Sequence, residues 1–145
     1  MRLHDLPDIL VVEKLSFTTP WSKTAFLSEL LENDRAYYLV ARHGEKAIGY
    51  AGVWLVAGEA HITNVAVHPD YRGQGVGRSL MQALEAIARV KRIRRMTLEV
   101  RRSNEIAQNL YVQLGFQGAG YRRGYYQDNN EDALIMWKEL DMATP

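Results

Sequence analysis

The chain has 145 residues, 47% of them apolar and 24% charged, and its 18 basic and 17 acidic residues give a net charge of +1. This composition predicts one globular domain over residues 1–145 and excludes a disordered chain, while the balanced charge argues against a nucleic-acid or membrane partner. The absence of cysteine excludes disulfides, thiolate metal sites and a cysteine nucleophile. Because no apolar run is long enough to cross a membrane and "MRLHDLPDIL" lacks the core of a secretion signal, we expect a cytoplasmic protein.

Two helices followed by three strands are predicted for the first half of the chain. Thr19 or Ser22 can cap the second helix, with Pro20 in its first turn, and Pro69 ends the third strand. The helices are expected at 6–16 and from the cap to about residue 32, and the strands at 36–42, 47–56 and 60–67.

The second half is predicted to hold a helix to about residue 92, a strand at 95–101, a helix at 103–114 and two final strands at 116–126 and 131–140. Ser103 or Asn104 can cap the later helix and Gly115 can end it. This order of elements is typical of an α/β protein, with a mixed sheet and helices on both faces.

The stretch "DYRGQGVGRSL" (70–80) joins a predicted strand to a predicted helix. It fits neither the phosphate loop G-x-x-x-x-G-K-[ST] nor the dinucleotide fingerprint G-x-G-x-x-G. A tight turn is the alternative, but three glycines between Arg72 and Arg78 at a helix N-terminus favour a cradle for pyrophosphate. Residues 72–78 are called the glycine loop below.

The spacing Arg72-x-x-Gly75-x-Gly77 resembles the acyl-CoA pyrophosphate motif [RQ]-x-x-G-x-[GA] of the GNAT acetyltransferase superfamily. Four further stretches resemble one of its subgroups, the bacterial ribosomal-protein alanine N-acetyltransferases (the RimI group). The stretches are "PWS" (20–22) with Phe26, "NVAVHPDYRGQGVGRSL" (64–80), "LEVRRSN" (98–104) with "LYVQLGF" (110–116), and "RRGYY" (122–126) with "EDALIM" (131–136).

The resemblance implies a single-domain GNAT fold with a mostly antiparallel sheet, whose usual first strand is expected here to be short or missing. It also implies acetyl-CoA as the donor, with pyrophosphate bound at the glycine loop and the thioester carbonyl polarised by main-chain amides of the preceding strand. The implied cofactor-binding residues are Val65, Ala66, Val67, Arg72, Gly73, Gln74, Gly75, Val76, Gly77, Arg78 and Asn104, the last of which can also be a helix cap.

Glu99 is the candidate general base. In "MTLEVR" it shares one face of the strand with Thr97 and Arg101, and a strand covered on both faces should bury it and raise its pKa. By the resemblance, Glu99 deprotonates the substrate ammonium through water. Glu59 and His61 are weaker candidates for the same role, and a solvated strand face is the structural alternative.

Tyr111 is the candidate general acid. Ile106, Leu110 and Leu114 mark the expected core stripe of its helix, and Tyr111 lies beside that stripe. The resemblance implies that its hydroxyl protonates the departing CoA thiolate, whereas a tyrosine at the edge of the core is the alternative.

The acceptor implied by the resemblance is the α-amine of a protein N-terminus, an alanine of a small-subunit ribosomal protein. Lysine or a small-molecule amine stays possible on the same fold, as does an acyl-CoA-binding regulator. An RNA-binding module around "RVKRIRR" (89–95) is a further alternative, although we expect no nucleic-acid partner. We expect no metal, since the four histidines form no zinc motif. We also expect a monomer. Aromatic candidates for a peptide channel are Trp21, Tyr37, Tyr38, Tyr125 and Tyr126.

Overall fold

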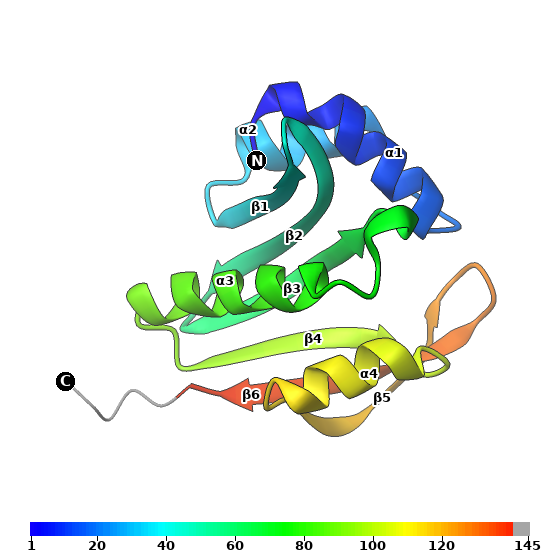
Figure 1. Cartoon of the computed structure of the whole chain (residues 1–145). Helices are drawn as coiled ribbons and strands as arrows, with labels where there is room; N and C mark the ends of the chain where they lie inside the picture. The colour runs from blue at the N-terminus through cyan, green and yellow to red at the C-terminus, as the bar shows by residue number, and fades with distance from the viewer. Residues whose placement is uncertain (141–145) are drawn as a thin grey trace. The chain divides into compact units, whose positions relative to one another are not determined.

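The computed structural model describes residues 1–140, which form four α-helices, six β-strands and two short 3-10 helices (Figure 1). No helix in this part of the chain is long and apolar enough to span a membrane. In chain order the main elements are α1 (Leu6–Ser16), α2 (Lys23–Glu32), β1 (Ala36–His43), β2 (Lys46–Val56), β3 (Glu59–Val67), α3 (Val76–Val90), β4 (Arg95–Arg101), α4 (Glu105–Gln113), β5 (Gln117–Tyr126) and β6 (Glu131–Glu139).

Local sequence signals set most of these boundaries. Both α1 and β4 begin and end at the predicted residues. Ser22 caps α2, because its hydroxyl accepts a hydrogen bond from the Ala25 amide at 3.1 Å. Pro20 therefore lies before the helix, and its predicted place in the first turn is wrong.

The strands hydrogen-bond in the order β1-β2-β3-β4-β6-β5 within one six-stranded sheet. β3 and β4 run parallel, whereas the β1–β2, β4–β6 and β5–β6 pairs are antiparallel. The predicted mixed and mostly antiparallel sheet is thus confirmed. The parallel pairing covers Glu59–His61 against Arg95–Thr97.

Residues 1–54 and 63–86 make up one compact unit, and residues 55–62 and 87 onward make up a second. In the first unit, α1 and α2 cover one face of β2, where the Phe26 ring meets the buried Tyr50 ring edge to face at 5.5 Å. On the other face, a Cβ added at Gly49 would lie 2.9 Å from the Ala66 carbonyl oxygen and 3.5 Å from the Leu80 side chain of α3. Helices therefore cover both faces of this strand, as predicted.

In the second unit, side chains on both faces of β4 are buried. Met96, Leu98 and Val100 are buried on one side, and Thr97 is buried on the other. The Thr97 hydroxyl donates a hydrogen bond to the Met136 carbonyl of β6 at 3.1 Å, which satisfies it inside the protein. A polar side chain on this strand therefore lies in a covered environment, as the sequence predicted for Glu99.

Candidate active site

The glycine loop follows a short 3-10 helix (Pro69–Tyr71) after β3 and leads into the first turn of α3. Gly73 and Gly75 have φ angles of +77° and +82°, which glycine adopts without strain, whereas Gly77 lies inside the helix. A Cβ at Gly73 or Gly75 would meet no atom within 4 Å, so backbone conformation is what requires glycine there. The Gly75 carbonyl accepts a helical hydrogen bond from Ser79 at 3.0 Å. The amides of the three residues after Gly75 therefore lie in the first turn, where an anion is favoured.

Arg72 fixes the glycine loop to its surroundings within the first unit. Its Nε donates a hydrogen bond to the Val67 carbonyl at 2.9 Å, and its Nη2 donates one to the Ser16 hydroxyl at 3.1 Å. The side chain thus joins the loop to the ends of β3 and α1. A guanidinium has five N–H donors, so hydrogens remain for an anion after these two contacts.

Val65, Ala66 and Val67 form the last part of β3, beyond its pairing with β4. Ala66 is buried in a core cluster with Phe26 and Tyr50, and the two valines are partly exposed. Their side chains serve packing. A role in binding a cofactor would therefore belong to their main-chain amides.

Glu99, on β4, is held by a histidine from β3 and an arginine from β5. Its Oε2 lies 2.7 Å from Nε2 of His61 on β3, and its Oε1 lies 3.4 Å from Nε of Arg122 on β5. The Glu99 side chain is 8% exposed, whereas that of His61 is 37% exposed. The structure thus brings Glu99 and the weaker candidate His61 together.

The two partners decide the protonation of Glu99. The hydrogen bond with His61 lowers the pKa of Glu99, and the charges of His61 and Arg122 lower it further, which together outweigh burial. The expected rise in the pKa of Glu99 is therefore wrong. The same hydrogen bond raises the pKa of His61, more than its own burial lowers it. In this pair Glu99 holds the negative charge and His61 has the greater affinity for a proton.

Tyr111 lies on the inner stripe of α4, and its ring lies 6.1 Å from that of Phe116. Burial raises the pKa of Tyr111 to about 12, so the phenol stays protonated at neutral pH, as a proton donor must. The predicted stripe is wrong at one position, because Ile106 is 86% exposed. The stripe runs instead through Ala107, Leu110, Tyr111 and Leu114, which are partly buried.

Asn104 is the cap of α4, since its side-chain oxygen accepts a hydrogen bond from the Ala107 amide at 3.1 Å. This leaves its amide nitrogen for other contacts. Of the two predicted caps, Ser103 and Asn104, the structure has Asn104. A role for Asn104 in binding the cofactor stays a prediction.

The aromatic candidates divide between the two units. In the first unit, Trp21 packs on Phe26 with the ring centroids 5.2 Å apart, Tyr37 is partly exposed on β1, and Tyr38 is buried in the core. Burial removes Tyr38 from the candidates for a channel wall. In the second unit, Tyr125 and Tyr126 meet edge to face at 5.1 Å.

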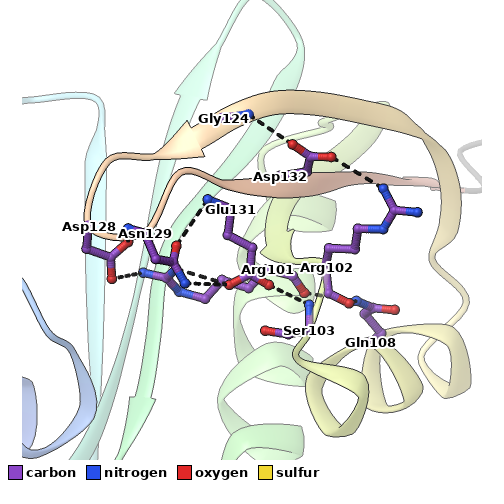
Figure 2. A network of polar contacts seen from close by, with 9 residues as sticks. All are labelled: Arg101, Arg102, Ser103, Gln108, Gly124, Asp128, Asn129, Glu131 and Asp132. Carbon is purple, nitrogen blue, oxygen red and sulfur yellow. Dashed lines mark hydrogen bonds and ion pairs between the residues drawn. The ribbon is translucent and has the colours of Figure 1, made fainter.

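A polar network that the sequence did not predict holds the hairpin of β5 and β6 to the end of β4 (Figure 2). Arg101 pairs with Asp128 at 2.8 Å and with Glu131 at 3.3 Å, and its guanidinium carbon lies 4.0 Å from the Tyr126 ring centroid. Glu131 also accepts a hydrogen bond from the Ser103 amide at 2.6 Å. The hydrogen bonds of Ser103 lower the pKa of Glu131 to about 2, with help from Arg101. The network thus positions the hairpin that carries both tyrosines.

Arg102 extends the network, pairing at 3.3 Å with Asp132, which accepts a hydrogen bond from the Gly124 amide at 3.0 Å (Figure 2). The run "RRS" (101–103) and the run "DNNED" (128–132) contain these partners, and their complementary charge is the signal that could have paired them. Arg101, Arg102 and Arg122 all lie in ion pairs.

Comparison with known proteins assigns the family. The profile of the Acetyltransferase (GNAT) family matches residues 6–116. The chain therefore belongs to the GNAT acetyltransferases, and the resemblance and fold class predicted from the sequence are confirmed.

The sequence relatives extend this match over nearly the whole chain. A Bacillus subtilis protein provisionally named [ribosomal protein bS18]-alanine N-acetyltransferase is 48% identical over 141 residues, which cover 97% of this chain and 93% of that protein. The Escherichia coli K12 protein named [ribosomal protein bS18]-alanine N-acetyltransferase is 36% identical over 144 residues, covering 98% and 96%.

Solved structures agree with the sequence relatives. The crystal structure of the ribosomal-protein-S18-alanine N-acetyltransferase from Escherichia coli matches with a TM-score of 0.89 at 36% identity and covers 99% of this chain and 93% of its own. The PaiA N-acetyltransferase from Thermoplasma acidophilum, crystallised with coenzyme A, has the same fold, with a TM-score of 0.83 at 21% identity and coverage of 97% and 96%.

Proposed function

We propose that this protein transfers the acetyl group of acetyl-CoA to the α-amine of the N-terminal alanine of the small-subunit ribosomal protein bS18. The observation that carries the proposal is the similarity, over nearly the whole chain, to two proteins named for that reaction. As a modifier of a ribosomal protein it would act in the cytoplasm, as a monomer, on a protein rather than on nucleic acid or a membrane.

Binding of the donor falls to the glycine loop and the end of β3. The first-turn amides of α3 face the pyrophosphate, assisted by Arg72, Gln74 and Arg78, and the glycines keep the backbone open to phosphate oxygens. The amides of residues 65–67 polarise the thioester carbonyl, and Asn104 contacts the cofactor with its free amide nitrogen. Acetyl-CoA supplies the activated acyl group, and no metal takes part.

The reaction is a direct attack by the amine in a ternary complex. Glu99 promotes loss of the ammonium proton, and the neutral amine forms the new C–N bond as the C–S bond breaks. Tyr111 gives its proton to the thiolate and is restored by the proton that the new amide nitrogen loses. Orientation of the two substrates supplies much of the acceleration. Trp21, Tyr37, Tyr125 and Tyr126 contact the acceptor peptide.

Two matched peptides test the acceptor. One has a free N-terminal alanine and no lysine, and the other has a blocked N-terminus and one lysine. We expect acetyl-CoA to acetylate the first alone, scored as a mass gain of one acetyl group. Acetylation of the lysine peptide alone would overturn the proposed acceptor, and acetylation of neither would overturn the proposal for peptides altogether.

Tyr111→Phe tests the proton donor. We expect kcat to fall by about 100-fold or more, because general acid catalysis contributes that much, while the affinity for acetyl-CoA measured by calorimetry changes little. Loss of acetyl-CoA binding in this variant would show that Tyr111 is structural.

A further inference from the structure

Three strands of the second unit bring His61, Glu99 and Arg122 together. His61 on β3 is the partner of Thr97 in the parallel pairing with β4, and Glu99 lies two residues further along β4 on the same face. Arg122 reaches Glu99 from β5. The cluster is therefore built by the sheet itself and not by a flexible loop.

Glu99 is poorly placed to receive a proton directly. Its side chain is 8% exposed, and each oxygen already has a partner, His61 at 2.7 Å and Arg122 at 3.4 Å. These partners stabilise the carboxylate and lower its pKa. A general base must both be reached by the substrate and have a useful proton affinity, and the buried carboxylate has neither property.

His61 has both properties. Its side chain is 37% exposed, and its ring turns Nε2 toward Glu99. When Nε2 carries the hydrogen and donates it to the carboxylate, Nδ1 holds a lone pair. The carboxylate thus selects the tautomer that can accept a proton at Nδ1, as the acidic partner of a catalytic histidine does in other enzymes.

We infer that Nδ1 of His61 takes the proton from the acceptor's ammonium and that Glu99 is the residue that positions His61 and fixes its tautomer for this role. The inference rests on the proposed function and deepens it, because it places His61 on the route by which Glu99 promotes deprotonation. Arg122 completes the site by keeping Glu99 ionised.

The proton balance of this step is simple. An N–H bond of the ammonium breaks, and the proton passes to Nδ1, which forms an imidazolium that Nε2 still ties to the Glu99 carboxylate. The neutral amine then forms the C–N bond to the acetyl carbon as the C–S bond breaks. After the product leaves, His61 returns the proton to solvent.

The charges around His61 set the pH range of the step. Glu99 on β4 raises the pKa of His61 through its hydrogen bond and its charge, and Glu59 on β3 raises it slightly. Arg122 on β5 lowers it. Tyr125 on the same strand feels the charge of Glu99, and its own pKa is raised mainly by burial, so it stays neutral.

The test compares the pH dependence of kcat, with the alanine peptide, in the wild type and in two variants. We expect His61→Gln to lower kcat by about 100-fold or more and to abolish the acid limb of the profile. Glu99→Gln should retain an acid limb but move it to lower pH, because the neutral amide no longer raises the proton affinity of His61. Glu59→Gln, on the same strand as His61, is the matched control and should move the limb only slightly.

A direct role for Glu99 predicts the opposite result. His61→Gln would then retain the limb and move it to higher pH, because Glu99 loses a cation, and Glu99→Gln would abolish it. That pattern would overturn the inference while leaving the proposed function intact. Absence of transfer by the wild-type protein to any peptide would overturn the proposed function itself.

Two further measurements test the role of His61 by a readout other than the loss of rate. In His61→Ala, added imidazole should restore part of the lost rate, since it replaces the missing base, and no restoration would count against the inference. An NMR titration of the histidine rings, assigned with His61→Gln, should show His61 titrating above its ordinary value of about 6.5 in the wild type and lower in Glu99→Gln. An unchanged titration in Glu99→Gln would contradict the pairing.

Discussion

Two buried glutamates, one in each unit, respond to burial in opposite ways. Glu13, on α1 in the first unit, is 1% exposed and accepts hydrogen bonds from the Tyr50 hydroxyl at 2.5 Å and from the Trp21 amide at 2.8 Å. Burial raises the pKa of Glu13 more than these neutral donors lower it. Glu99 faces His61 and a guanidinium instead, and its pKa is lowered.

The difference shows that the partners of a buried carboxylate decide whether the effect of burial prevails. Neutral donors compensate part of the lost hydration of Glu13, and the carboxyl serves to join α1, β2 and the turn before α2. The hydrogen bond with His61 and the charge of Arg122 contribute to outweighing burial at Glu99, and the result is a negative charge beside a histidine. The first arrangement suits packing, whereas the second suits proton transfer.

The largest expected effect is on activity, from Glu99→Ala. We expect kcat/KM for the alanine peptide to fall by about 100- to 10,000-fold, because the variant loses the carboxylate that positions His61 for deprotonation. Glu45→Ala, in the exposed turn between β1 and β2, is the control and should be unchanged. A loss of less than tenfold in a folded Glu99→Ala protein would place Glu99 with Glu13 as a structural carboxylate.

Glu13→Ala should affect stability instead. We expect the free energy of unfolding to fall by about 2–4 kcal/mol, because the Tyr50 hydroxyl and the Trp21 amide lose their acceptor in the core. Glu13→Gln should lose less, about 1 kcal/mol, since the amide oxygen still accepts from Trp21 and the amide nitrogen can donate to Tyr50. Denaturant unfolding followed by circular dichroism measures both, and equal losses in the two variants would contradict this account.

Most of the fold could be predicted because its signals are local. The period of apolar residues fixed both ends of α1 and β4, and the capping residues limited the start of α2 to two alternatives, of which Ser22 is the cap. The glycine loop could likewise be placed between β3 and α3, since three glycines between two arginines stand out in any sequence.

The partners of Glu99 could not be predicted for a physical reason. Contact with His61 depends on the register of β3 against β4, which are parallel and separated by a helix in the chain. Contact with Arg122 depends on β5, whose pairing with β6 shifts between Gly118 and Gly120 and between Arg122 and Tyr126, so simple alternation fails there. Without the partners, burial alone suggested the wrong direction for the pKa of Glu99.

The pH dependence of stability should have opposite signs at the two carboxylates. Because the pKa of Glu13 is raised on folding, the native state holds a proton there that the unfolded state releases, and the stability from Glu13 is lost as the pH rises through the folded pKa. Because the pKa of Glu99 is lowered on folding, the contribution of Glu99 to the stability of the protein is present above the unfolded pKa and is lost as the pH falls through the folded pKa.

Free energies of unfolding of Glu13→Gln and Glu99→Gln, each subtracted from the wild type between about pH 2 and pH 6, below the range in which His61 titrates, would show the two slopes. His61 contributes to stability in a higher pH range. Because its pKa is raised on folding, its contribution is fully present below the unfolded pKa of about 6.5 and is lost as the pH rises through the folded pKa. Slopes of the same sign for the two glutamine variants would refute the comparison.

The smallest expected effect is that of Arg122→Met. The Arg122 side chain is 56% exposed and its Nε lies 3.4 Å from Oε1 of Glu99, so solvent screens the pair. Removal of the guanidinium should therefore lower the free energy of unfolding by less than about 1 kcal/mol. Loss of this cation should raise the pKa of His61, because Arg122 lowers it. The histidine NMR titration measures this shift, with Arg123→Met as the control on the neighbouring residue. A shift to lower pH would mean that Arg122 acts by holding Glu99 in place, and that geometry rather than charge ties the carboxylate to His61.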